Sequence, residues 1–146
     1  MVVGRAQLGL QIDPVTVAVL GYQFPDAADY WDGNWLVVDI RAGKTLGINR
    51  DPCLRTDELH QFHEELSAMI AGAPMAKLVP MEPYFELVLT KNADTDKTAV
   101  SARIWSSGAK EQETISFDVG ADDLSKLRCD LDDILKEFPV RARNVH

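Results

Sequence analysis

Apolar and polar residues alternate along much of the first half of the chain. A period of two residues places one set of side chains on one face of a strand. Asp13-Pro14 interrupts this alternation, and a turn-rich loop at residues 25–34 interrupts it again. The pattern predicts an antiparallel β-meander with strands at residues 8–12, 15–24, 35–41 and 45–49.

Two later segments change to the helical period. Residues 56–71 begin with Thr56 as the expected N-cap, carry Asp57 and Glu58 in the first turn, and are followed by Gly72. The apolar stripe of this helix consists of Leu59, Phe62, Leu66, Met69 and Ile70. A second helix is predicted at residues 122–137, with the stripe Leu124, Leu127, Leu131, Ile134 and Leu135.

The second half of the chain resembles the first in plan. Further strands are predicted at residues 84–91, 98–106 and 114–119 before the second helix. Each apolar residue of that helix comes 65 positions after its counterpart in the first helix. This offset is compatible with a duplicated unit of β-meander plus helix, although any two amphipathic helices can be aligned in this way.

These elements predict a single α+β domain covering residues 1–146. Short connections and the absence of long apolar runs indicate an antiparallel sheet of about six to eight strands, with both helices packed on one face. The residues expected to face the core are Leu8, Leu10, Ile12, Leu36, Val38, Ile40, Phe85, Leu87, Leu89, Val100, Ala102, Ile104, Ile115, Phe117 and Val119.

Charge narrows the choice of partner. Acidic residues outnumber basic ones by 23 to 15, which gives a formal charge of -8. This charge disfavours nucleic acid and anionic membrane surfaces as partners, and it favours either simple solubility or a basic protein partner. No targeting segment or membrane span is predicted, and the two cysteines, Cys53 and Cys129, are expected to be free thiols in the cytoplasm.

The sequence predicts no catalytic, cofactor or metal site. His60, His63 and Glu64 lie close together on the first helix but match no zinc motif, so His63 is interpreted as a histidine at the helix edge. No serine lies in a G-x-S-x-G setting, and no glycine-rich loop matches a nucleotide-binding pattern.

The face of the sheet away from the helices provides the candidate binding residues. Large aromatic rings beside charged groups are typical of interface hot spots, but they also stabilise sheets through cross-strand pairs. Two alternatives use the same face: a homodimeric module joined through its tryptophans or an edge strand, and a small hydrolase in which three carboxylates converge. The candidate residues are Trp35, Asp39, Glu86, Arg103, Trp105 and Asp118.

Several short motifs resemble one known family. They are Asp32-Gly33-Asn34-Trp35-Leu36, Thr56-Asp57-Glu58-Leu59, Met81-Glu82-Pro83, Ile115-Ser116-Phe117-Asp118-Val119 with Asp123-Leu124, and Phe138-Pro139-Val140-Arg141. In these motifs, from about Asp13 to Arg141, the chain resembles the WapI family of small bacterial immunity proteins.

The resemblance implies a non-enzymatic cytoplasmic protein that binds and neutralises a cognate toxin domain by occlusion. Separately, the protein is expected to be a monomer or a homodimer. In that family the toxin is typically a nuclease. A nuclease domain tends to be basic around its substrate groove, so the acidic charge of this chain would steer it toward such a partner. The resemblance supplies no contact residues, and the candidates above follow from the face of the sheet alone.

Overall fold

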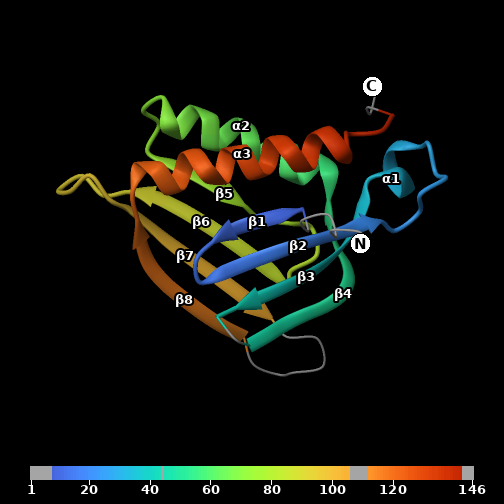
Figure 1. Ribbon diagram of the computed structural model, residues 1–146, viewed down its shortest axis with the longest axis horizontal. Coiled ribbons are helices and arrows are strands. Elements are labelled where there is room, and N and C mark those ends of the chain that lie inside the picture. Colours follow the sequence, from blue (N-terminus) through green and yellow to red (C-terminus); the bar gives the residue numbers. More distant parts are fainter. Residues whose placement is uncertain (1–7, 44, 106–111, 143–146) are drawn as a thin grey trace, which may run out of the picture.

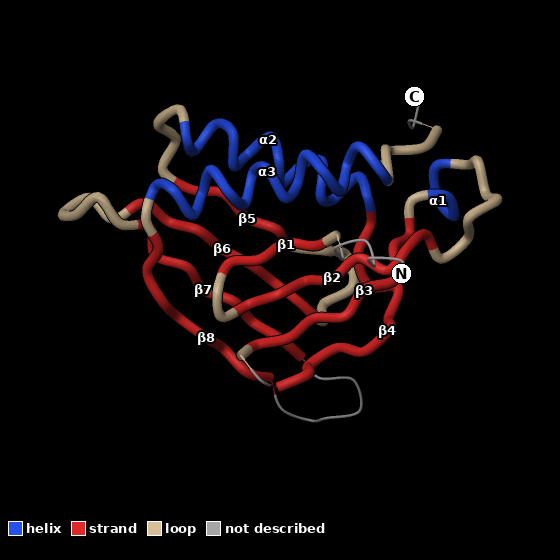
Figure 2. The backbone as a smooth tube through the Cα atoms, in the orientation of Figure 1, coloured by secondary structure: helices blue, strands red, loops and turns tan. Residues whose placement is uncertain are grey.

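The computed structural model describes residues 8–43, 45–105 and 112–142. Eight strands and three helices lie within them (Figures 1 and 2). In chain order they are β1 (Gly9–Ile12), β2 (Val15–Tyr22), α1 (Tyr30–Gly33), β3 (Trp35–Ala42), β4 (Thr45–Arg55), α2 (Thr56–Ile70), β5 (Met75–Leu78), β6 (Phe85–Lys91), β7 (Thr98–Trp105), β8 (Gln112–Val119) and α3 (Ala121–Glu137).

The strands form two antiparallel sheets, in the orders β1-β2-β3-β4 and β5-β6-β7-β8. The predicted α+β class with antiparallel strands and two amphipathic helices is confirmed. The strands do not form one sheet, however, because α2 carries the chain away from β4 and the short strand β5 then pairs with β6. The structure thus contains two successive units of four strands and a long helix.

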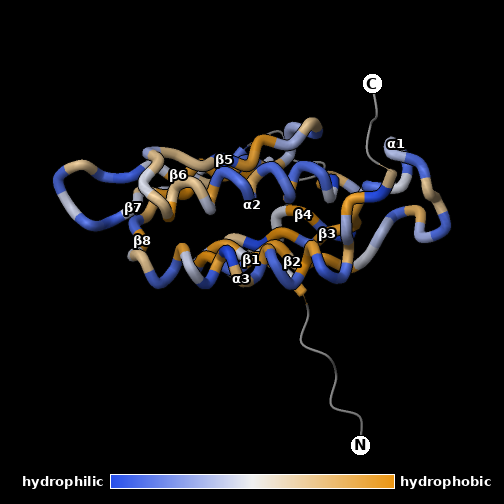
Figure 3. Tube along the Cα trace, turned by 90° about the horizontal axis from the view of Figure 1, so that it is seen from above, coloured by the Kyte–Doolittle hydropathy of each residue, from blue (hydrophilic) through white to orange (hydrophobic). Residues whose placement is uncertain are grey.

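Each long helix covers the sheet that it does not follow. α2 follows the first sheet but packs along β5 of the second, and α3 follows the second sheet but packs along β1 of the first. Figures 1 and 3 show the two helices side by side above both sheets. Glu65 on α2 accepts a hydrogen bond from the Lys77 backbone N–H (3.1 Å), and Asp130 on α3 accepts one from the Gln11 N–H (3.0 Å). Both helices therefore satisfy a backbone donor on an edge strand.

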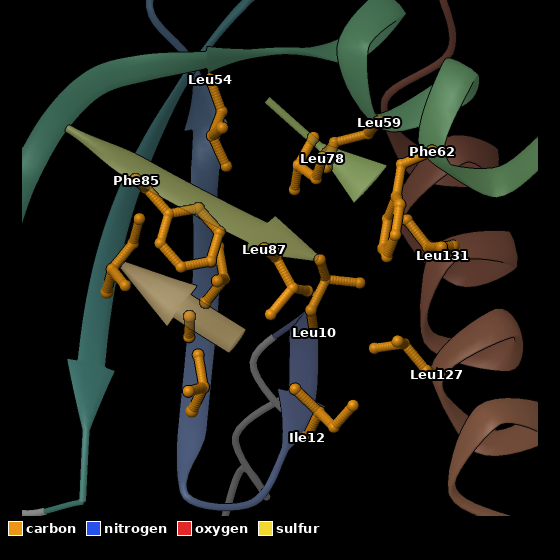
Figure 4. Packing of buried hydrophobic residues seen from close by; sticks show 14 of the residues in the cluster. Leu10, Ile12, Leu54, Leu59, Phe62, Leu78, Phe85, Leu87, Leu127 and Leu131 are labelled. Atoms are coloured by element: carbon orange, nitrogen blue, oxygen red, sulfur yellow. The ribbon is translucent and has the colours of Figure 1, made fainter. Parts of the chain in front are cut away.

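One hydrophobic core joins the two units. Figure 4 shows side chains from β1 and β6 packed beside Phe62 of α2 and Leu127 and Leu131 of α3. All three helix residues are fully buried. Every residue predicted above to face the core is buried or packs against it. Burial of this apolar surface supplies the main favourable free energy of folding.

The two sheets approach each other closely where β4 meets β7. A Cβ atom placed on Gly47 would lie 2.5 Å from Cγ2 of Ile104, which is shorter than a van der Waals contact. Glycine is required at this position because any side chain would displace buried Ile104. This contact closes the core on the side opposite the helices.

Some local features differ from the prediction. The one-turn helix α1 and strand β5, each four residues long, were not expected. The N-cap of α2 is Arg55, one residue before the expected Thr56, and β4 extends as far as Arg55. The predicted end of a strand at Ser106 lies outside the described residues.

Candidate functional site

The two sheets separate the candidate residues. Trp35 and Asp39 belong to β3 in the first sheet, whereas the other candidates belong to the second sheet. The prediction that Trp35 and Trp105 share one face of a single sheet is therefore wrong. Trp35 is 9% exposed and packs edge-on against Trp31, with 5.9 Å between ring centroids. Asp39 is half-buried, and its carboxylate accepts a 2.7 Å hydrogen bond from the N–H of Arg50.

This bond gives Asp39 a structural role. Arg50 has a φ of 50°, in the left-handed region that non-glycine residues seldom adopt. The pairing of β3 with β4 shifts register around this residue, between Val38 and Ile40. The Asp39 carboxylate accordingly satisfies the backbone of an irregular strand, as expected for a β-bulge.

The outer face of the second sheet retains Glu86, Arg103, Trp105 and Asp118. Glu86 and Arg103 are directly opposite each other on β6 and β7, and their side chains form an ion pair. Trp105 is 40% exposed, and its backbone N–H donates to the carbonyl of Tyr84 (2.8 Å). Asp118, near the end of β8, is exposed. An open tryptophan thus lies on the same strand face as an arginine–carboxylate pair.

Three shallow depressions cross this face. The first, about 330 Å³, contains Trp105 and Arg103 together with Pro83, Tyr84 and Gln112. The second, about 150 Å³, shares Arg103 with the first and shares Val88 and Ser101 with the third. The third, about 330 Å³, extends to Asp118. Because they share lining residues, we treat them together as the Trp105 groove.

The three candidate carboxylates do not converge. Asp39 lies in the first sheet, and Glu86 is engaged by Arg103. The position beside Arg103 on β8 is Thr114, and Asp118 lies four residues farther along that strand, a separation of about 13 Å at 3.3 Å per residue. Paired-carboxylate hydrolysis needs two groups within about 10 Å across one bond. The arrangement required by the hydrolase alternative is therefore not formed.

An aromatic cage lies at the start of α2. The Arg55 guanidinium is 4.8 Å from the ring centroid of Trp31, 4.9 Å from that of Trp35 and 5.1 Å from that of Tyr30. It donates to the carbonyls of Trp31 (2.7 Å) and Tyr30 (2.8 Å) and to Asp57 (2.9 Å). A cation at a helix N-terminus is unfavourable, and burial adds a desolvation cost, so Arg55 depends on these partners.

The cage holds a loop at residues 23–34, which we call the Trp31 loop. Buried Asn34 donates to the carbonyls of Tyr30 (2.7 Å) and Arg141 (3.0 Å), and its own oxygen accepts from the Arg141 N–H (2.8 Å). The Arg141 guanidinium lies 3.5 Å from the Tyr22 ring centroid and donates to the carbonyl of Ala27 (2.8 Å). The loop is thus fixed at both ends, yet Trp31 remains 51% exposed.

A depression of about 580 Å³ lies between α2 and β5, and we call it the α2 cavity. Two groups in its wall, Tyr30 and Glu58, have shifted pKa values. A hydrogen bond to Asp57 (2.8 Å), together with burial, raises the pKa of Tyr30. Burial raises the pKa of Glu58, although hydrogen bonds from the Met81 and Arg55 backbones oppose the shift. The lining residues are Tyr30, Asp57, Glu58, His60, Gln61, Glu65, Lys77, Leu78 and Val79.

His63 and Cys53 have structural surroundings. His63 on α2 lies 2.6 Å from Asp132 on α3, so it links the two helices. Burial raises the pKa of the Cys53 thiol to about 12, and Cys129 is exposed on α3. Among the described residues, no group of three or more His, Cys, Asp and Glu side chains is arranged to hold a metal ion.

The sequence reasoning missed the Arg55 cage and the α2 cavity. One signal was present: Arg55 directly precedes Thr56-Asp57, and a lone arginine at a helix start needs compensating partners. The nearby Tyr30 and Trp31 could have supplied them. The α2 cavity had no such signal, because β5 was not predicted.

The described part of the chain presents open surfaces and a braced loop, which are features of a protein-binding module. None of its described helices is both long and apolar enough to span a membrane. Comparison with protein-family models gives a match to the immunity protein WapI-like family over residues 7–139. The chain belongs to this family.

Other comparisons add little. No curated protein matches the sequence. Among solved structures, the chain is similar to one from the crystal structures of Trypanosoma brucei MRP1/MRP2, with 13% sequence identity, a TM-score of 0.43, and coverage of 87% of this chain and 86% of that chain.

Proposed function

We propose that this protein is a non-enzymatic immunity protein that binds a cognate toxin domain in the cytoplasm and neutralises it by occlusion. The family match over residues 7–139 carries this proposal. The toxin is proposed to be a nuclease, whose basic substrate groove would be attracted by the charge of -8. Stoichiometric blocking needs a stable interface and no catalytic group.

The Trp105 groove is the proposed toxin-binding surface. Trp105 offers a large ring that is 40% exposed, with Arg103 and Glu86 beside it. Tryptophan and arginine are enriched at binding hot spots because they bury much area for little conformational entropy. Asp118 supplies a free carboxylate at the far end of the groove for a basic contact.

Removal of the Trp105 ring tests the groove. Trp105→Ala should weaken binding to the cognate toxin domain by about tenfold, since a hot-spot truncation costs more than about 1 kcal/mol. Isothermal calorimetry measures the affinity, and circular dichroism checks that the variant is folded. An affinity equal to that of the native protein would exclude Trp105 from the interface.

A matched pair of charge reversals separates contact from steering. Asp118→Lys changes the groove, whereas Asp133→Lys makes the same change in charge on the exposed side of α3. Both variants change the net charge by the same amount, so a larger loss for Asp118→Lys would place its carboxylate near the bound partner. Equal losses would leave long-range electrostatics as the only contribution of Asp118.

Oligomeric state and protection from the toxin complete the test. Sedimentation at several concentrations measures the oligomeric state, and a stable dimer that buries Trp105 would favour the homodimeric alternative. Cells producing the toxin domain should survive only when this protein is produced with it. Continued toxicity in the presence of the folded native protein would refute the immunity proposal.

A further inference from the structure

The α2 cavity combines acidic walls with an exposed apolar rim. Val79 lines it and is 57% exposed, and Met81 is 58% exposed and bonded through its N–H to the Glu58 carboxylate (2.6 Å). Trp31, which is 51% exposed, follows Tyr30 of the cavity wall. Among the six large apolar side chains that are exposed in the described residues, Val79 lines the cavity, and Trp31 and Met81 each lie next to a residue of its wall, through the chain and through a hydrogen bond respectively. Such clustering is typical of a protein-binding surface.

The charges in the cavity select the partner chemistry. Asp57 is already paired with Arg55 (2.9 Å). The other acidic groups of the lining are the carboxylates of Glu58 and Glu65, and the basic groups are the ammonium of Lys77 and the ring of His60. Glu65 uses one oxygen for the Lys77 backbone N–H, and its other oxygen accepts from Gln61 at 3.3 Å. The negative balance favours a cationic group that donates several hydrogen bonds.

The wall of the cavity is ordered without a partner. Tyr30 is fixed through its hydroxyl by Asp57 and through its carbonyl by Arg55 (2.8 Å). The Glu58 carboxylate joins the start of α2 to the segment after β5 through its bonds to the Arg55 and Met81 N–H groups. A binder therefore pays little entropy to order this side of the interface.

We propose that the α2 cavity receives an arginine side chain of a protein partner, whose apolar neighbours in sequence contact Trp31, Val79 and Met81. A guanidinium fits better than an ammonium because it is more weakly hydrated and offers five donors to separated acceptors. The segment after β5 borders both the cavity, through Val79, and the Trp105 groove, through Pro83 and Tyr84. With the toxin as partner, the inference rests on the proposed function and extends the same interface.

A peptide titration tests the cavity without the toxin. The probe is acetyl-Leu-Arg-Leu-amide, and the control peptide has citrulline in place of arginine, which keeps the shape and removes the charge. Nuclear magnetic resonance should show the arginine peptide shifting the Trp31 indole and Met81 methyl signals. The citrulline peptide should bind at least about threefold more weakly, as expected for a partly exposed ion pair. Equal binding of the two peptides, or shifts confined to Trp105, would overturn the proposal.

Single-charge variants locate the contact. Glu65→Gln keeps an acceptor for the Lys77 N–H and should weaken arginine-peptide binding about threefold. Glu64→Gln makes the same charge change on an exposed residue that does not line the cavity, although its carboxylate lies 3.8 Å from His60, and it should have a smaller effect. Lys77→Gln should strengthen binding, because it removes the competing cation. Equal effects of Glu64→Gln and Glu65→Gln would show that the cavity does not hold the peptide.

The toxin domain distinguishes the two proposals. If the native protein fails to bind or neutralise it, the proposed function fails, and the peptide titration still decides the cavity. If the native protein and Glu65→Gln bind the toxin domain equally well, the cavity is excluded from the toxin interface and the immunity function stands. A selective loss in Glu65→Gln, but not in Glu64→Gln, supports both.

Discussion

The two units of the molecule share a scaffold but differ at the start of their helices. Leu59 and Leu124, like Phe62 and Leu127, are equivalent positions 65 residues apart, and all four are buried. Both helices also begin with the same bond, in which a carboxylate at the third position accepts from the backbone N–H of the N-cap residue.

The N-cap residues themselves show the difference. In the first unit this position is Arg55, which is 1% exposed and surrounded by three aromatic rings. In the second unit it is Gly120, whose nearest surroundings leave room for a Cβ atom. The first unit also inserts the Trp31 loop between β2 and β3, where the second has only residues 92–97 between β6 and β7. One scaffold thus carries a braced binding element in one unit and a plain connection in the other.

Loss of the Arg55 side chain should have the largest effect on this comparison. Arg55→Gly gives the first unit the N-cap residue of the second. Because glycine is a tolerated N-cap residue, the loss of stability measures the contribution of the Arg55 cage alone. The free energy of unfolding should fall by about 3–5 kcal/mol, because Asp57 and two carbonyls lose their buried donor. Urea denaturation measures it.

The control for this variant is Arg41→Ala, which truncates an exposed arginine on β3. It should change stability by no more than about 0.5 kcal/mol. If Arg55→Gly is as mild as Arg41→Ala, then the cage adds nothing to stability and the two units are equivalent at this position.

Removal of either carboxylate that bonds an edge strand should reduce stability by less than Arg55→Gly does, and by the same amount in both units. Glu65→Ala and Asp130→Ala should each cost about 1 kcal/mol, the value of one hydrogen bond to a charged acceptor near the surface. Their effects should add in the double variant, since they act on different edge strands. Thermal and urea unfolding of the native protein, the two single variants and the double variant give a double-mutant cycle. A large loss for one variant alone would show that the two helix contacts are not equivalent.

The first unit should also give a specific pH dependence through Glu58. Burial raises the pKa of this carboxyl above its ordinary value, so the folded protein holds its proton more tightly than the unfolded chain does. The resulting stabilisation is complete below the ordinary pKa and is lost as the pH rises through the raised folded pKa.

Glu58→Gln removes this titration. As the pH rises from the ordinary glutamate pKa through the raised one, the stability of the native protein should fall relative to that of Glu58→Gln, and above the raised pKa the difference should be constant. Urea denaturation across that range measures the difference. A difference that does not change with pH, or that changes in the opposite direction, would contradict the assigned environment of Glu58.

The smallest effect, with the opposite sign, is expected in the second unit. Gly120 has a φ of -100° and a ψ of 179°, which any residue can adopt, and a Cβ atom there would lie 3.8 Å from the Asp123 carboxylate. Gly120→Ala should be neutral or should stabilise the protein by up to about 0.5 kcal/mol, since it restricts the unfolded chain but is a poorer cap. A loss of several kcal/mol would mean that this glycine is as constrained as Arg55.

Local patterns predicted most of the fold because alternation and helical stripes record which side of an element is buried. The residues expected in the core, from Leu10 to Val119, lie there. The offset of 65 residues between the helices also corresponds to the two structural units. These features depend on nearby residues, and they survive small errors in strand boundaries.

The candidate site was harder to predict because it depends on how distant elements meet. Trp35 was expected to share a sheet face with Trp105, but its strand lies in the first sheet, and the ring is covered by Trp31 and Arg55. Strand alternation specifies two faces and not which one is covered by another segment. The pairing of β5 with β6 is set by four residues, too few to give a periodic signal.

The exchange of helices makes the two units dependent on each other during folding. The apolar side of α2 has its principal strand contact in β5, which is synthesised later, and the edge of β1 is bonded by α3, near the end of the described chain. A nascent chain that stops after α2 would expose both an apolar helix face and an unpaired strand edge. We therefore expect separately produced halves to be unstable alone and to recover a native structure only when they are produced together.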